Sequence, residues 1–175
     1  VNKEELDDFK ELTIDSTAVK ANSAWPTDGK MLIGLLERSH NLSQQLHTFE
    51  LKNFSKGCLP RWIKEMHSLE FEICLTAGKP NSKIKMKKNY RKLLEKGNKA
   101  AAAMARELEK MEKGLNLDTL LPSRLEMCAR TIEQIRSDIS DAKLVAEYAY
   151  DRIFHDINLP STEKILSLSD GTAAY

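Results

Sequence analysis

Apolar residues recur at helical spacing through the middle of the chain. The first such segment begins at Thr27 or Asp28, either of which can cap a helix, and the second begins near Pro60, which suits a first helical turn. Breaks at Lys56–Gly57 and Gly78–Pro80 bound the second segment. The predicted inward positions are Met31, Leu32, Leu35, Leu36, Leu42 and Leu46 in the first segment, and Trp62, Ile63, Met66, Leu69 and Ile73 in the second.

Two longer segments carry a heptad pattern, in which apolar or small residues alternate at steps of three and four. A stretch of turn residues, Gly114 to Pro122, separates them. We therefore predict a long antiparallel coiled-coil hairpin with arms of roughly 45–50 Å at 1.5 Å per residue. Its seam positions are Met86, Tyr90, Leu93, Gly97, Ala100, Met104, Leu108 and Met111 in one arm, and Leu125, Cys128, Ile132, Ile135, Ile139, Ala142, Ala146, Ala149 and Ile153 in the other.

Both ends of the chain have a different pattern. Leu12–Lys20 is rich in residues that favour strands and is stopped at Trp25–Pro26. Near the other end, Ile165–Leu168 is strand-like and is followed by the hairpin-turn pair Asp170–Gly171. The sequence thus predicts a mainly α fold, a helical bundle flanked by short β-strands.

Composition narrows the class of protein. The 175 residues include 41% hydrophobic and 30% charged residues, which is enough for one domain with a core, and the net charge is +1, so any basic surface must be local. The cysteines (Cys58, Cys74, Cys128) and histidines (His40, His47, His67, His155) show no spacing typical of a metal site, and we expect the cysteines to be buried thiols. There is no signal-peptide pattern and no apolar run long enough for a membrane span, so we expect a cytosolic piece cut from a longer chain, without a membrane partner.

A basic tract opens the third segment. Lys79–Lys99 holds nine basic residues and one acid, Glu95, for a local charge of +8. Such a tract can neutralise phosphates along DNA, although a solvated helix face is the common alternative. Tyr90 could contact a sugar or base, but it also occupies the seam. The residues that we single out as DNA-binding candidates are Lys83, Lys85, Lys87, Lys88, Arg91 and Lys92.

The two ends of the chain carry a family resemblance. The run "IDSTAVKANSAWPTD", followed by about 130 helical residues and then by "LPSTEKILSLSDGTAAY", resembles DDE-type transposases of bacterial insertion sequences. That family has a ribonuclease-H-like core whose first strand carries a catalytic aspartate, and one branch interrupts the core with a helical insertion. The resemblance implies residues 1–26 as the first core strand, 27–158 as a helical insertion domain and 159–175 as resumed, truncated core strands.

The resemblance also implies a catalytic role. Asp15 would be the first metal-binding carboxylate, with Thr17 and Asp28 in support, and the parent protein would use Mg²⁺ or Mn²⁺ to cleave and join transposon-end DNA in the bacterial cytoplasm, at the nucleoid. The other two acidic ligands of the family would lie beyond Tyr175, so this chain alone should bind no metal and be inactive. A homodimer is a further possible partner, and no small-molecule substrate is expected.

Simpler interpretations stand beside these. Asp15 could be an ordinary edge or turn residue, and Asp28 could be a helix cap. The whole chain could instead be a non-enzymatic helical interaction module whose long hairpin binds a partner protein.

Overall fold

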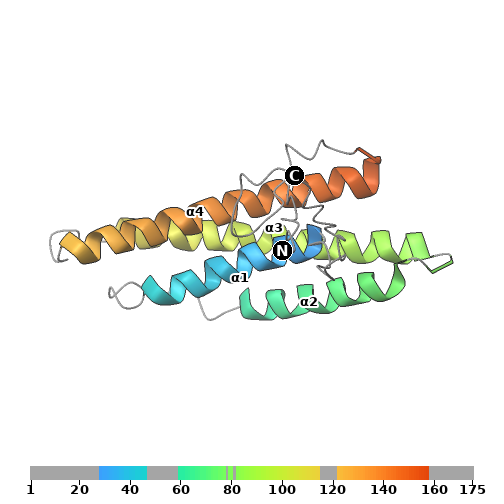
Figure 1. Cartoon of the computed structure of the whole chain (residues 1–175), viewed down its shortest axis with the longest axis horizontal. Helices are drawn as coiled ribbons and strands as arrows, with labels where there is room; N and C mark the ends of the chain where they lie inside the picture. Colours follow the sequence, from blue (N-terminus) through green and yellow to red (C-terminus); the bar gives the residue numbers. More distant parts are fainter. Residues whose placement is uncertain (1–27, 47–58, 78, 81, 115–121, 158–175) are drawn as a thin grey trace, which may run out of the picture.

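The fold is an antiparallel bundle of four α-helices. The computed structural model describes residues 28–46, 59–77, 79–80, 82–114 and 122–157. These form α1 (Asp28–Leu46), α2 (Leu59–Thr76), α3 (Ser82–Gly114), α4 (Pro122–Tyr150) and a π-helical turn, η3 (Asp151–His155). Successive helices alternate in direction, and α3 and α4 are the longest (Figure 1).

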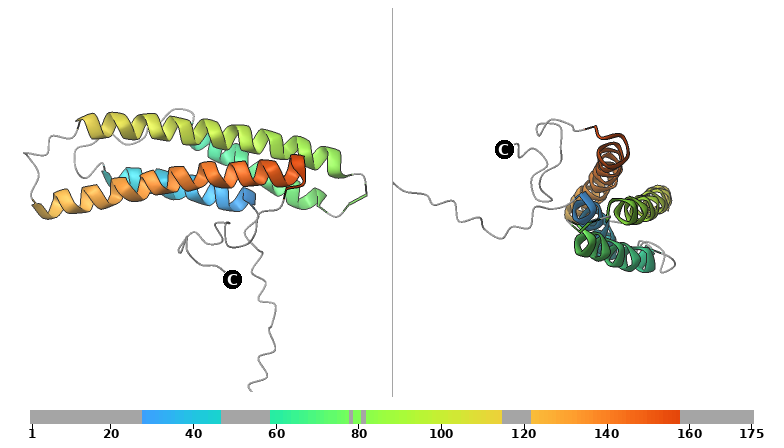
Figure 2. Two further views of the ribbon diagram at one scale, coloured as in Figure 1. Left: turned by 90° about the horizontal axis from the view of Figure 1, so that it is seen from above. Right: turned by 90° about the vertical axis from the view of Figure 1, so that its right-hand side faces the viewer.

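Each helix packs mainly against one other helix. α1 lies mainly along α4, and α2 lies mainly along α3, while α3 and α4 also contact each other. The end-on view in Figure 2 shows the four helices around a shared centre. The predicted α3–α4 hairpin is therefore one side of a bundle, because α1 and α2 cover much of the apolar surface that a two-stranded coiled coil would leave exposed.

The predicted seams are the inner faces of α3 and α4. Leu93, Ala100 and Met104 in α3, and Ile135 and Ala142 in α4, are at most 1% exposed. Gly97 lies at a close approach between α3 and α1, because a Cβ atom built at this position would be 2.7 Å from Cδ2 of Leu32. The seam glycine thus makes room for a core leucine.

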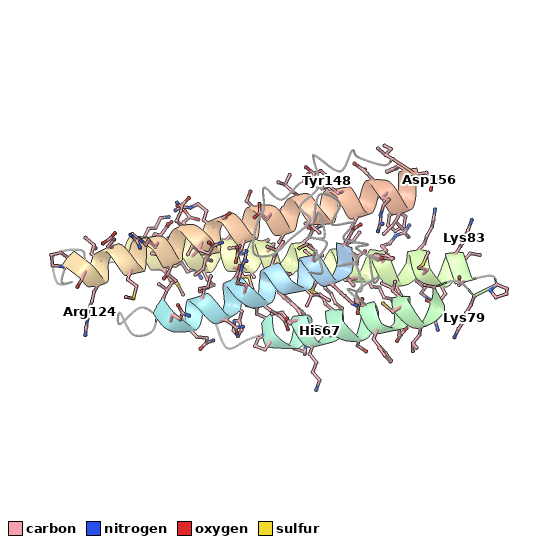
Figure 3. The ribbon with its side chains drawn as sticks, viewed as in Figure 1. His67, Lys79, Lys83, Arg124, Tyr148 and Asp156 are labelled. Carbon is pink, nitrogen blue, oxygen red and sulfur yellow. The ribbon has the colours of Figure 1, made fainter. Side chains whose placement is uncertain are left out.

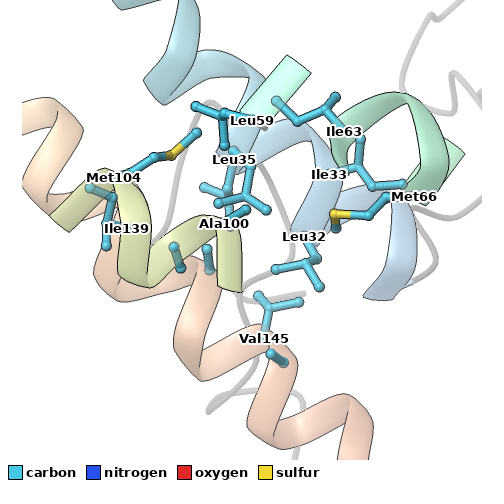
Figure 4. Packing of buried hydrophobic residues seen from close by; sticks show 14 of the residues in the cluster. Leu32, Ile33, Leu35, Leu59, Ile63, Met66, Ala100, Met104, Ile139 and Val145 are labelled. Atoms are coloured by element: carbon cyan, nitrogen blue, oxygen red, sulfur yellow. The ribbon is translucent and has the colours of Figure 1, made fainter. Parts of the chain in front are cut away.

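The core is continuous across all four helices. Figure 4 shows Leu32 and Leu35 of α1 near Met66 of α2, Met104 of α3 and Val145 of α4. Burying a side chain of this size contributes about 1.5–3 kcal/mol relative to leaving it exposed. Packing of this core, rather than helix propensity alone, therefore stabilises the bundle.

One polar contact joins α1 to α4 within this apolar interior. Arg38 donates from Nε and Nη2 to the two oxygens of Asp138, at 2.8 and 2.6 Å, and Gln134 donates to Asp138 Oδ1 at 2.8 Å. Asp138 is fully buried, and its hydrogen bonds raise the pKa of the Arg38 guanidinium. A bidentate pair of this kind is short and directional, so it fixes the register of α1 against α4.

The predicted fold class requires a correction. The described residues are helical or in short turns and include no strand, so the expected helical bundle flanked by β-strands of a ribonuclease-H-like core is wrong, and these residues form an all-helical bundle. The strand prediction rested on Leu12–Lys20 and Ile165–Leu168, which lie outside the described residues. Its physical basis was weak, since β propensity depends on the neighbouring strands that a sheet supplies.

Candidate nucleic-acid interface

The basic tract begins at the turn between α2 and α3 and continues along the first half of α3. Lys79 and Lys83 lie at this end of the bundle, as Figure 3 shows, and both are exposed. The other basic residues of the tract lie on three faces of α3. These are an outward stripe, a pair that faces η3, and one lysine that faces α2.

The outward face carries Lys85, Lys88, Lys92 and Lys99, which we call the lysine stripe. Their spacing of three, four and seven residues places them on one side of α3, opposite the buried seam. All four are exposed. The ion pairs found among the described residues include none of them. At 1.5 Å per residue the stripe is about 21 Å long.

The other basic residues of the tract contact the protein itself. Lys96 forms a half-buried ion pair with Glu65 of α2. Lys87 and Arg91 lie over the ring of Phe154 in η3, with Lys87 Nζ at 6.0 Å and Arg91 Cζ at 5.3 Å from the ring centroid. The predicted DNA-binding set is thus divided, and Lys83, Lys85, Lys88 and Lys92 are exposed and take part in none of these contacts.

Many charges elsewhere on the bundle form ion pairs, some along one helix and some between helices. In the second half of α3, Lys110 pairs with Glu107 and Lys113 with Glu109, each at 2.8 Å. α4 repeats the pattern with Arg130 and Glu126 at 2.6 Å. Other pairs of the bundle are Arg61–Glu65, Glu37–His67, Arg136–Glu133 and Arg136–Glu112.

The basic half of α3 is electrostatically unfavourable for folding. Its first turn carries no acidic residue, although an N-terminal turn favours negative charge. Like charges also stand four residues apart at Lys83 and Lys87, and at Lys88 and Lys92. Each such pair costs about 0.2–0.5 kcal/mol in an isolated helix. Lys96, Lys87 and Arg91 make contacts within the bundle, whereas the lysine stripe has no evident stabilising role.

Asp28 lies at the start of α1 and contacts η3, near the C-terminal end of the described residues. Its Oδ2 atom is 2.6 Å from Nη2 of Arg152 in η3. Tyr90 of α3 is buried nearby, and burial raises the pKa of its phenol. Tyr90 is accordingly a core residue, and the Asp28 carboxylate joins α1 to η3.

The thiols and imidazoles form no described active site. Cys128 is buried as predicted, whereas Cys74 is an exposed residue, so the prediction is wrong there. Its Sγ donates to Glu70 Oε1 at 3.0 Å, and this hydrogen bond raises the pKa of the thiol. His67 contacts Glu37 at 2.6 Å, and burial lowers the pKa of His40.

Sequence reasoning missed two polar contacts. Asp138 follows Ile135 by three residues and precedes Ala142 by four, so its helical phase predicts an inward position. A charged residue in that phase signals a buried partner, here Arg38. The pairing of Phe154 with Lys87 and Arg91 has no sequence signal, because it depends on how α4 lies against α3.

The predicted catalytic residue, Asp15, and the predicted supporting residue, Thr17, lie outside the described residues. Within the described residues, no cluster of three His, Cys, Asp or Glu side chains is arranged to hold a metal ion. None of the described helices combines the length and apolar character needed to span a membrane.

No protein-family model matches the chain, and comparison with curated proteins and with solved structures finds no similar protein. The case for a function therefore depends on the residues and on the charge arrangement of the bundle.

Proposed function

We propose that the chain is part of a DDE-type DNA transposase and that its helical bundle binds transposon DNA through the lysine stripe. The lysine stripe carries the proposal, since four exposed lysines share one helix face without a carboxylate partner among the described residues. Phosphates would neutralise this face and release the counterions that it holds. Contacts of this kind position a protein on DNA without reading its sequence.

The two ends of the described bundle support its assignment as an inserted unit. Asp28 opens α1, Arg152 lies in η3, and the two side chains are 2.6 Å apart. An insertion into another domain needs an entry and an exit that are close together. The arrangement fits the proposed insertion at residues 27–158, and the Asp28 carboxylate joins its two ends. The active-site support predicted for Asp28 stays a prediction.

The proposed catalytic chemistry belongs to a longer parent protein. Asp15 would be one carboxylate ligand of Mg²⁺ or Mn²⁺, and further acidic ligands would come from beyond Tyr175. The described residues contain no such ligand cluster, and the Asp28 carboxylate is paired with Arg152. In a full-length parent, Asp15→Asn should abolish strand cleavage and leave DNA affinity nearly unchanged, because it removes a ligand without changing shape. Efficient cleavage by that variant would overturn the catalytic assignment.

A binding experiment with matched charge changes tests the DNA interface. The stripe variant replaces Lys85, Lys88, Lys92 and Lys99 with Gln. The control variant replaces the exposed Arg106, Lys110, Lys113 and Arg130 with Gln, which changes the net charge equally. Fluorescence anisotropy with a 30-base-pair duplex in 50 mM salt should show a loss of affinity of at least tenfold for the stripe variant and less than threefold for the control. Equal losses would mean that net charge alone governs binding, and the proposed interface would be wrong.

A helical interaction module is the second candidate, and exposed apolar residues on α2 favour it. Phe71 is 63% and Leu75 52% exposed, one turn apart on α2. An apolar pair of this kind could mediate self-association. In that case sedimentation velocity should show a dimer that Phe71→Ser with Leu75→Ser converts to a monomer, while duplex DNA has no effect on either form.

A further inference from the structure

Two cations of α3 share one aromatic ring of η3. Lys87 and Arg91 are one turn apart, and both lie within 6.0 Å of the Phe154 ring centroid. Cation–π attraction favours each contact separately. The two positive charges nevertheless repel each other, and among the described residues neither belongs to an ion pair. This site is therefore suited to an incoming anion.

Two further rings extend the aromatic surface. The Tyr150 and Phe154 centroids are 4.8 Å apart with a tilt of 35°, and the Tyr150 and His155 centroids are 5.4 Å apart. Tyr150 is 44% exposed and His155 is also exposed. Parts of the Tyr150 and His155 side chains are thus accessible to solvent beside the two cations.

The helix changes geometry where it carries these rings. α4 ends at Tyr150, and η3 continues it as a single π-helical turn, Asp151–His155. Such turns are rare and are frequently found at functional sites. In η3, Arg152 contacts Asp28 of α1 while Phe154 contacts α3. Contacts on two sides thus hold the ring-bearing turn in place, which limits the reorganisation required for binding.

We infer that Lys87, Arg91, Tyr150, Phe154 and His155 form a basic-aromatic surface that binds unpaired nucleotides of a DNA strand. Bases stack on the exposed rings while Lys87 and Arg91 contact the adjacent phosphates, the combination found in proteins that bind single strands. Paired bases are stacked inside a duplex and do not offer their faces to these rings. The inference rests on the proposed DNA function, and it adds a preference for single-stranded DNA at the η3 end of the lysine stripe.

The test compares single-stranded and duplex DNA of equal length. Fluorescein-labelled dT20 and a 20-base-pair duplex are titrated with the chain in 50 mM salt. The ring variant carries Tyr150→Leu and Phe154→Leu, which keep apolar side chains and remove the aromatic faces. Its control is Phe71→Leu, which removes an aromatic ring that is 63% exposed on α2 and is not part of the Tyr150, Phe154 and His155 ring contacts.

The ring variant should bind dT20 at least tenfold more weakly and the duplex within twofold of the original chain, since stacking of each base contributes about 1–3 kcal/mol. Phe71→Leu should leave both affinities unchanged. Undetectable binding of dT20 by the original chain, unchanged binding by the ring variant, or a parallel loss for both DNAs would overturn the inference.

A second variant tests the inference even if the ring variant does not fold. Lys87→Gln with Arg91→Gln keeps all three rings, and it should make the salt dependence of dT20 binding shallower by about 1.4, given about 0.7 per phosphate for single strands. An unchanged slope would contradict the inference. The lysine-stripe variant separates the two proposals, because it should lose duplex affinity while keeping most of its affinity for dT20. If it keeps its duplex affinity instead, the proposed duplex interface fails independently of the dT20 results.

Discussion

The two halves of α3 use charge in opposite ways. From Ser82 to Lys99 the helix carries eight basic residues and one acid, whereas from Ala100 to Gly114 it carries three of each. In the second half Lys110 and Lys113 pair with glutamates of the same helix. In the first half the lysine stripe faces solvent without such partners among the described residues.

The inner face of α3 shows no corresponding difference. Leu93 in the basic half and Met104 in the balanced half are both fully buried in the same core. Packing is thus continuous along the helix while surface charge changes abruptly. This separation indicates that the apolar face specifies the fold and that the lysine stripe is available for binding. Two of the next four predictions test that separation on α3, and the other two test the buried charge pair between α1 and α4 and its neighbour.

The largest effect on folding should come from the buried charge pair. Asp138→Ala removes a fully buried carboxylate and leaves Arg38, whose side chain is 33% exposed, without its bidentate partner, so it should lower the free energy of unfolding by about 1.5–3 kcal/mol. Urea denaturation followed by circular dichroism measures the change. Glu133→Ala, an exposed acid on the same helix, is the control and should change stability by less than about 0.5 kcal/mol. A small effect of Asp138→Ala would mean that this buried charge does not support the fold.

A smaller loss should follow from filling the close approach at Gly97. A Cβ there would be 2.7 Å from Leu32, so Gly97→Leu should overpack the core and cost about 1–3 kcal/mol. The neighbouring change Asn98→Leu places the same side chain at an exposed position and should not destabilise the bundle. Thermal unfolding of the two variants provides the comparison, and equal melting temperatures would argue against close packing of α1 on α3.

Neutralising the lysine stripe should raise the free energy of unfolding rather than lower it. Replacing Lys85, Lys88, Lys92 and Lys99 with Gln removes like-charge repulsion, so stability in 20 mM salt should rise by a few tenths of a kcal/mol. The gain should shrink in 500 mM salt because the repulsion is screened. A clear destabilisation would mean that the stripe contributes to the fold and is not reserved for a partner.

The smallest predicted effect concerns a carboxylate beside the buried pair. Burial, and then the charge of Asp138, raises the pKa of Asp141. A raised carboxyl pKa in the folded state favours the protonated form, so the stability contributed by Asp141 is present below its ordinary pKa of 3.8 and is lost as the pH rises. Asp141→Asn should therefore stabilise the bundle slightly at pH 7, and the difference from the original chain should disappear near pH 3. The exposed Glu147→Gln is the control, and a gain that persists at pH 3 would contradict the assigned cause.

The sequence predicted the helices because their apolar periodicity is long and regular. The seams through Leu93, Met104 and Ile135 are buried as expected. The partner of each helix was not predictable, since α1 and α2 cover seams that could equally have closed on each other or on a second chain. For the same reason, the division of the basic tract into a stripe, a Phe154-facing pair and the Lys96–Glu65 pair required the three-dimensional arrangement.

The salt dependence of duplex binding tests the central claim most directly. If the lysine stripe contacts four phosphates, neutralising it should make the slope of log affinity against log salt shallower by up to about 3.6, at 0.9 per contact. The control variant at Arg106, Lys110, Lys113 and Arg130 should keep the original slope. This result would assign the counterion release to the stripe, whereas equal slopes for the two variants, whether changed or unchanged, would contradict the separation of a folding face from a DNA-binding face on α3.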